Sequence, residues 1–192
     1  MANFEGTMLR WASLLRLTDT MKESEYIRLV MPLRDRLFRF AQSLLLSSAE
    51  AEDAVHDLLA RLWRDHERME LPRRVDAFLL TALRNRCYDQ LRRRQAEARR
   101  SEAVKQSAER STDAEIRQWE ARELVRRAMA QLPDRQREVL HLKEIEGYAT
   151  HEIAAMIGCD EAQVRVILSR GRMALRGILQ KMRNDERTTR TD

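Results

Sequence analysis

Near the C-terminus, one segment combines cationic side chains with the spacing of a helix that can enter a DNA groove. From Val164 to Leu175 the apolar positions recur at i, i+3, i+4, i+7 and i+11, which places them on one face of a helix. Guanidinium and hydroxyl groups, which can bind phosphates and base edges, occupy another face: Arg165, Ser169, Arg170, Arg172 and Arg176. This arrangement predicts a DNA-binding helix with a separate side for docking on its own domain.

The residues before this helix predict a tight turn. Gly158 stands where a left-handed residue ends a helix at little cost. Asp160 can cap the helix that follows, and Gln163, three residues later, has the position of a capping-box partner. Gln163 therefore has two interpretations, a hydrogen bond to its own backbone or a contact with a base. Residues 150–176 are interpreted as two short helices in a helix-turn-helix, with DNA as the first partner to test.

Composition favours an all-α fold. The chain has 192 residues, of which 43% are hydrophobic and 35% are charged, with only 5 Gly and 3 Pro. That leaves little material for turns, and no strand-like alternation is sustained. The formal net charge is +5. It is concentrated in residues 84–100, with seven arginines against two carboxylates, and in residues 161–176, with four arginines against one. Two basic stripes on a slightly acidic body are typical of a protein that binds phosphates.

A polar segment divides the chain. Between Leu91 and Ile116 the only aliphatic residue apart from alanine is Val104, so the segment cannot bury enough apolar surface to offset ordering its backbone. We therefore expect two small helical domains, residues 23–94 and 113–183, joined by a flexible polar linker at 95–112. The Ala, Glu, Arg and Gln content of the linker allows it to be partly helical at either end. Residues 1–22 are interpreted as a dispensable N-terminal extension and residues 184–192 as a polar, frayed tail.

The first domain contains a complete amphipathic helix. Its apolar stripe runs through Val55, Leu58, Leu59, Leu62 and Trp63. The opposite side carries ionisable groups: Asp53, His56, Asp57, Arg61 and Arg64. Pro72 then marks a loop over residues 64–74.

The next helix has a polar face of unusual content. Its apolar stripe includes Phe78, Leu79 and Leu83, whereas hydrogen-bonding groups, one aromatic ring and cations form the exposed row: Thr81, Arg84, Asn85, Tyr88 and Arg92. Arginines hold phosphates, and an exposed ring can stack on an unpaired base. The alternative is an ordinary solvated face that ends in a basic turn suited to the helix dipole.

The second domain opens with a helix whose apolar stripe is Leu124, Val125, Ala128, Met129 and Leu132. Pro133 and Asp134 favour the start of another helix, which ends near Gly147 and precedes the helix-turn-helix.

Nothing in the sequence indicates a metal, a cofactor or a membrane span. The two cysteines, Cys87 and Cys159, are far apart, and no Cys/His spacing resembles a metal site. We interpret them as reduced, cytosolic thiols. No apolar run approaches the length that crosses a bilayer.

Three stretches together resemble a known family. Residues 51–63 have an acidic start followed by an apolar run ending in Leu-Trp, and residues 77–94 contain Ala-Leu-Arg-Asn-Arg-Cys-Tyr-Asp-Gln-Leu-Arg-Arg-Arg from position 82. Leu132-Pro133 is followed by Arg-Glu-Val-Leu at 137–140, Gly147-Tyr148 and Glu-Ile-Ala at 152–154. In order and spacing these stretches resemble a bacterial extracytoplasmic-function (ECF) sigma factor of the sigma-70 family, over residues 23–183.

The resemblance implies binding to core RNA polymerase, without bond chemistry. The first domain would dock on the polymerase clamp through the exposed face of its amphipathic helix: Asp53, His56, Asp57 and Arg61. The resemblance also implies an anti-sigma factor that keeps the two domains in a closed, inactive arrangement until a signal arrives.

The resemblance further implies two promoter contacts. The opened −10 strand would be held by Arg73, Arg74, Arg84, Asn85, Tyr88, Arg92 and Arg93, with the loop at residues 66–74 capturing a flipped base. The −35 duplex would be read by the second domain through Gln163, Arg165, Ser169, Arg170, Arg172 and Arg176.

The sequence departs from the family at the recognition helix. Where the family often has a run like Thr-Val-Lys-Ser-Arg, this chain has Gln-Val-Arg-Val-Ile at 163–167, so the second basic position is the apolar Ile167. Ala54 and His56 also stand where a larger aliphatic residue and Gln are more usual. These changes bear on promoter choice and partner detail more than on class.

Three other functions remain as alternatives at this point. A helix-turn-helix regulator that does not bind polymerase would leave the 53–63 helix and the 84–94 face unexplained. A small helical hydrolase or nuclease would need a convergent catalytic set, and the four histidines show no pairing with carboxylates or cysteines. An RNA-binding or anti-termination adaptor is the third.

Overall fold

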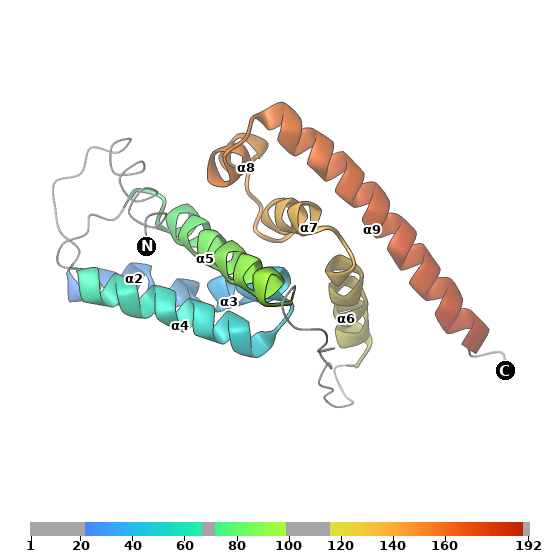
Figure 1. Cartoon of the computed structure of the whole chain (residues 1–192), viewed down its shortest axis with the longest axis horizontal. Coiled ribbons are helices and arrows are strands. Elements are labelled where there is room, and N and C mark those ends of the chain that lie inside the picture. The colour runs from blue at the N-terminus through green and yellow to red at the C-terminus, as the bar shows by residue number, and fades with distance from the viewer. Residues whose placement is uncertain (1–21, 67–71, 99–115, 190–192) are drawn as a thin grey trace. The chain divides into compact units, whose positions relative to one another are not determined.

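The computed structural model describes residues 22–66, 72–98 and 116–189, and every regular element within these ranges is helical (Figure 1). The all-α prediction is therefore confirmed. The chain divides into two compact units, residues 1–100 and residues 101–192. Each unit is described by itself.

The described residues of the first unit form α2 (Glu23–Leu29), the short 3₁₀ turn η1 (Met31–Leu33), α3 (Arg34–Leu45), α4 (Ser48–Asp65) and α5 (Val75–Ala98). Helices α3, α4 and α5 contact one another. Leucine side chains from all three, such as Leu37, Leu62 and Leu83, form a core with almost no solvent exposure. Burial of these stripes fixes which side of α4 and of α5 faces outward.

Ion pairs at the rim of this core connect α5 to its neighbours. Arg94 Nη1 lies 2.8 Å from Glu50 Oε2 on α4, and Arg36 Nη1 on α3 lies 3.4 Å from Asp76 Oδ2 on α5. Such partly exposed pairs contribute about 0–1 kcal/mol each. They help to orient α5, while the apolar contacts provide most of the stabilisation.

The second unit contains α6 (Ile116–Ala130), α7 (Asp134–Leu140), the π-helical turn η3 (His141–Ile145), α8 (Thr150–Ile157) and α9 (Glu161–Thr189). Helices α6, α7 and α8 all contact α9. The apolar face predicted for α9 is buried at Val164, Leu168 and Gly171. Val125 of the predicted α6 stripe is 43% exposed, so the stripe there is narrower than its spacing suggested.

Helix packing explains why a glycine stands at position 171. A Cβ placed on it would lie 3.0 Å from Cδ1 of Leu140 on α7. The absence of a side chain at this position therefore allows α7 and α9 to approach closely. This close approach packs one face of α9 against its domain, and the opposite face of the helix remains exposed to solvent.

Helix α5 enters the end of the linker that could be partly helical, and helix α9 runs further than the sequence indicated. Helix α5 continues to Ala98, through the first residues of the predicted linker. Helix α9 has 29 residues and reaches Thr189, so the second helix of the motif is long and the predicted frayed tail is largely helical. Gln, Ala and Glu are good helix formers, which explains the extension of α5 through residues 95–98. The predicted N-terminal extension to residue 21, and the linker from residue 99, lie outside the described residues.

Candidate nucleic-acid interface

Helix α4 presents ionisable side chains on its outward side. Val55, Leu58 and Leu62 are almost fully buried, so the opposite face must point to solvent. The four predicted partner-binding residues are all exposed there: Asp53, His56, Asp57 and Arg61. The geometry brings them onto one surface, as expected, and their binding role stays a prediction.

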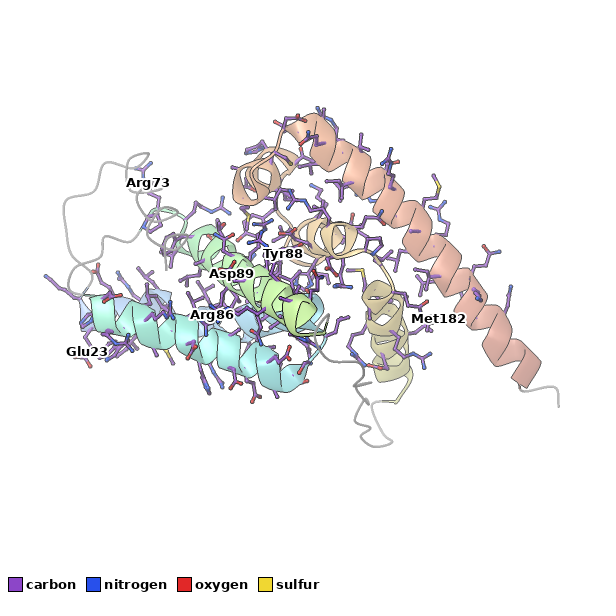
Figure 2. The ribbon with its side chains drawn as sticks, viewed as in Figure 1. Glu23, Arg73, Arg86, Tyr88, Asp89 and Met182 are labelled. Atoms are coloured by element: carbon purple, nitrogen blue, oxygen red, sulfur yellow. The ribbon has the colours of Figure 1, made fainter. Side chains whose placement is uncertain are left out.

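One of the four is already engaged within the unit. The Asp57 carboxylate accepts a hydrogen bond from the guanidinium of Arg86, which reaches across from α5 (Figure 2). Within the described part of the chain, Asp53, His56 and Arg61 make no such contact. Asp57 therefore has a structural task in addition to any partner contact, which its exposed helical position did not reveal.

Trp63 is an exception to the apolar stripe of α4. Its side chain is 41% exposed. It stacks on the His66 ring at a centroid distance of 4.6 Å and meets the Tyr26 ring edge-on at 5.0 Å. The Tyr26 hydroxyl donates to the Leu59 carbonyl at 3.1 Å, and burial raises the pKa of Tyr26. The end of α4 thus carries an aromatic cluster in which Trp63 is exposed and Tyr26 is buried, rather than a core tryptophan.

Helix α5 brings three predicted nucleic-acid residues together. Arg84 Nη1 donates to Asn85 Oδ1 at 3.0 Å, and the guanidinium carbon of Arg84 lies 4.8 Å from the centre of the Tyr88 ring. All three side chains are half-buried. A cation held over an aromatic ring gains electrostatic stabilisation, so this cluster is partly preorganised, with a cation, an amide and a ring close together.

Thr81 does not belong to this exposed row. It is only 4% exposed, and its hydroxyl donates to the Ala77 carbonyl at 2.8 Å. Threonine can satisfy its hydroxyl on the preceding turn of its own helix and then be buried. Helical spacing alone placed it on the polar face, and that prediction was wrong.

The remaining arginines predicted at this site differ in whether they form an ion pair within the described residues. Arg74 Nε lies 3.2 Å from Asp76 Oδ1, and Arg92 Nη1 lies 3.2 Å from Asp89 Oδ1. Arg73 and Arg93 are exposed and make no ion pair within the described ranges. Residues 67–71 of the predicted base-capturing loop lie outside those ranges.

The turn of the helix-turn-helix has the predicted geometry. Gly158 ends α8 in the left-handed conformation, with φ of 69°. Asp160 Oδ1 accepts a hydrogen bond from the backbone N–H of Gln163 at 2.7 Å, which confirms the predicted cap. The Gln163 side chain is exposed and makes no hydrogen bond to another described residue. Of its two interpretations, the geometry favours the one in which it can reach a base.

The outward side of α9 carries all six predicted duplex-binding residues, and each is exposed. Arg165 Nη1 lies 3.2 Å from Glu161 Oε2, and Arg172 Nη2 lies 2.6 Å from Glu144 Oε1 on η3. These pairs are exposed and are worth about 0–1 kcal/mol, so a phosphate can replace the carboxylate. Within the described ranges, Ser169, Arg170 and Arg176 make no such contact.

A groove of about 530 Å³ follows this side of α9. Its lining combines Arg165, Ser169, Arg172 and Arg176 with Thr150 and with Lys143, whose ammonium donates to the Tyr148 carbonyl at 3.2 Å. Lys143 was missed from the sequence because its turn is π-helical, and a 3.6-residue period does not place it correctly. It adds a fourth cation to the groove.

The sequence also did not predict the buried charged side chains of α7. Arg137 is 3% exposed, and its guanidinium donates to the carbonyls of Ala130 and Leu132 at 3.2 and 2.9 Å. Glu138 is fully buried, with Arg135 Nη1 3.2 Å from its carboxylate. The only signal was the Arg-Glu-Val-Leu run at 137–140, which indicated a family but not a role.

Within the described residues, no group of His, Cys, Asp and Glu is arranged to hold a metal ion. Cys87 is buried and Cys159 is half-buried, and both are unbridged. No described helix has the length and apolar content needed to cross a bilayer.

Comparison with known families gives two matches. Sigma-70 region 2 matches residues 29–97, and sigma-70 region 4 matches residues 122–175. The ECF RNA polymerase sigma factor SigL of Mycobacterium tuberculosis is 33% identical over 150 residues, which cover 76% of this chain and 84% of SigL. The RNA polymerase sigma-E factor of Streptomyces coelicolor is 29% identical over 158 residues, covering 82% of this chain and 86% of that protein.

A solved structure also resembles the chain. The sigma factor RpoE of Bartonella quintana, determined in complex with the anti-sigma factor NepR, superposes with a TM-score of 0.71 at 27% sequence identity. The match covers 82% of this chain and 98% of RpoE.

Proposed function

The chain belongs to the ECF sigma factors of the sigma-70 family, and from that premise we propose which of its surfaces perform each step of initiation. It binds core RNA polymerase and directs promoter-specific transcription initiation. The observation that carries the assignment of surfaces is that all six duplex-binding candidates are exposed on one side of α9, away from the core.

Core polymerase docks on the outward face of α4. Asp53, His56 and Arg61 are exposed, without an internal partner among the described residues, and so are available to another protein. Asp57 lies beside them and also contributes to polymerase binding, while its carboxylate pairs with Arg86. The buried stripe beneath keeps these charges in a fixed pattern, which favours a specific protein contact over non-specific attraction.

Asp53→Arg should weaken core polymerase binding about tenfold, because it reverses a charge that a basic partner surface would meet. Asp53 is preferable to Asp57 for this test, since a change at Asp57 also removes the link to Arg86. The measurement is a binding titration of labelled protein with core polymerase. Asp35→Arg, an exposed acidic residue on α3, is the matched control, and an equal loss in both variants would count against the α4 face.

The opened −10 strand lies on α5. Arg84, Asn85 and Tyr88 supply the cation, the hydrogen-bonding amide and the stacking ring. The exposed arginines at 73, 74, 92 and 93 lie near the two sides of this cluster along the chain and bind phosphates. The loop that precedes α5 captures the flipped base.

The −35 duplex lies against α9. The first turns of a recognition helix meet base edges, and later turns meet the phosphates. Gln163, Arg165 and Ser169 therefore contact bases, with Arg170 beside them, and Arg172 and Arg176 hold the backbone.

Arg165→Ala and Arg176→Ala should have different effects. Loss of a base contact costs about 1–3 kcal/mol and relaxes selectivity at one position of the −35 element. Loss of a phosphate contact weakens all sequences alike and reduces the salt slope by about one. Binding titrations across salt concentration and across single-base −35 variants separate the two outcomes. If Arg165→Ala weakens all sequences equally, base reading belongs to other residues of α9.

The two functional domains span residues 23–94 and 113–183, and residues 95–112 connect them. Such a connection raises the effective concentration of one domain at its promoter element once the other is bound. Residues 1–22 are not required for either activity.

Regulation follows from the resemblance to RpoE, whose solved complex contains the anti-sigma factor NepR. We infer that this chain is likewise held inactive by an anti-sigma factor, in the cytoplasm where polymerase and promoters are found. It acts by binding alone, with no cofactor, metal or catalytic step.

Transcription in vitro with core polymerase on genomic DNA, followed by mapping of start sites, tests the whole proposal. Defined start sites that share upstream elements, and that appear only when the chain is added, are the expected result. Sequence-specific DNA binding without any gain in transcription would instead indicate a helix-turn-helix regulator that does not use polymerase.

A further inference from the structure

Val166 is an apolar side chain in an otherwise polar region of α9. It is 48% exposed. The helix is oriented by Val164 and Leu168, which are 0% and 4% exposed. At about 100° per residue, Val166 lies about 200° from Val164 and so points almost directly away from the domain.

Three of the four neighbours of Val166 on the helix surface are residues proposed to contact the −35 element. Positions three and four residues away on a helix are adjacent, and these are Ala162, Gln163, Ser169 and Arg170. All four are exposed. Val166 therefore stands at the centre of the surface that faces outward at the start of α9.

The position on the helix determines which part of DNA Val166 meets. A major groove about 12 Å wide admits one helix, with a diameter of about 10–12 Å. The side chain opposite the domain then points to the floor of the groove, where base edges lie. Side chains about 100° to either side, such as Arg165, point toward the edges of the groove, where a long side chain can reach either a base edge or a phosphate. Val166 cannot donate or accept a hydrogen bond, so it needs an apolar partner on the floor.

The thymine C5-methyl group is the apolar group that base pairs present in the major groove. From the orientation of Val166 and the chemistry of the groove floor, we propose that Val166 is a specificity-determining residue that reads a thymine methyl group in the −35 element. This rests on the proposed −35 role of α9.

Deoxyuridine provides the test, because it pairs like thymidine and lacks only the methyl group. The probes are double-stranded fragments of a promoter found by start-site mapping, with each −35 thymine in turn replaced by deoxyuridine. Burying one methyl group corresponds to about a fourfold change in affinity. The holoenzyme should therefore lose about fourfold in affinity at one particular thymine and little at the others.

Val166→Ala should remove this discrimination. The variant should bind the thymine fragment about fourfold more weakly than the wild type does. It should bind the deoxyuridine fragment about as well as the wild type does. Met173→Ala is the matched control, since Met173 is 71% exposed on the same side of α9 but two turns later. It should keep the full preference for thymine. Both side chains are exposed, so neither change should disturb folding.

The outcomes separate this proposal from the one on which it rests. A mapped promoter whose −35 binding is indifferent to every methyl group overturns the role of Val166 and leaves −35 recognition standing. Discrimination that persists in Val166→Ala, or that disappears in Met173→Ala instead, assigns the methyl contact to another residue. Absence of any mapped promoter overturns both proposals.

Discussion

Tyr88→Ala should slow open-complex formation by at least about fivefold, because stacking of one unpaired base on an aromatic ring is worth about 1–3 kcal/mol. The ring lies next to the Arg84 guanidinium, at 4.8 Å from its carbon to the ring centre, and Arg84 also donates to Asn85. Removing the ring thus removes the stacking surface and loosens the cation beside it. Asn85→Ala should have a smaller effect in the same direction, since it removes one hydrogen-bond partner.

Permanganate footprinting of the holoenzyme on a mapped promoter measures strand opening, and a binding titration at low temperature measures the closed complex. The closed complex should be unaffected, because the −35 contacts come from the other unit. Tyr88→Phe is the control: it keeps the ring and should open the promoter nearly as well as the wild type. Normal melting in Tyr88→Ala would mean that the α5 face is merely solvated.

The faces of the helices could be predicted where burial follows the helical period. Val164, Leu168 and Gly171 were assigned to one side of α9 by spacing, and they are buried. Asp53, His56 and Arg61 were assigned to the open side of α4, and they are exposed. Spacing is sufficient in these cases because each helix has one apolar face and a single core to bury it.

The helical spacing predicted the wrong exposure where a side chain makes a contact that cannot be inferred from its residue type. Thr81 can be buried because its hydroxyl bonds to the Ala77 carbonyl. Trp63, at the end of α4, is 41% exposed and stacks on His66 instead of entering the core. Lys143 was missed because η3 is π-helical. Long-range pairs such as Asp57 with Arg86 depend on how α4 and α5 cross. A periodic pattern contains none of this information.

Helix boundaries failed for a different reason. The residues after Arg94 and after Arg183 are polar, which suggested a linker and a frayed tail. Residues 95–98 are also good helix formers, which allowed for helix at the start of the linker, and α5 continues through them to Ala98. The residues after Arg183 include Asn, Asp and Thr, which are weak helix formers, and α9 nevertheless continues to Thr189. Polarity indicates that a segment has no core to join, but it does not indicate where a helix stops.

Arg137→Ala should destabilise the second unit by about 3 kcal/mol. The guanidinium is 3% exposed and donates to the Ala130 and Leu132 carbonyls between α6 and α7. It also donates to the Asp134 carboxylate at 2.5 Å. Removing a buried donor leaves its acceptors desolvated and without that partner, which costs about 1–3 kcal/mol per group.

Hydrogen exchange followed by mass spectrometry can assign this loss to one unit. Protection should fall in α7 and α8 and remain unchanged in α3 and α4, because the two units have separate cores. Arg170→Ala removes the same charge from an exposed position, and its protection pattern should match the wild type. Equal exchange in Arg137→Ala and Arg170→Ala would show that the buried hydrogen bonds contribute little.

The same substitution separates stability from recognition. Arg137 lies beneath the turn that begins α7, and α7 supplies Leu140, against which Gly171 of α9 packs. When the second unit opens, the α9 surface loses its support, and −35 binding should fall together with hydrogen-exchange protection. Core polymerase binding should persist, because α4 belongs to the other unit. If −35 binding and core polymerase binding were lost at the same extent of unfolding of the second unit, the two units would fold as one. That result would contradict the separate cores.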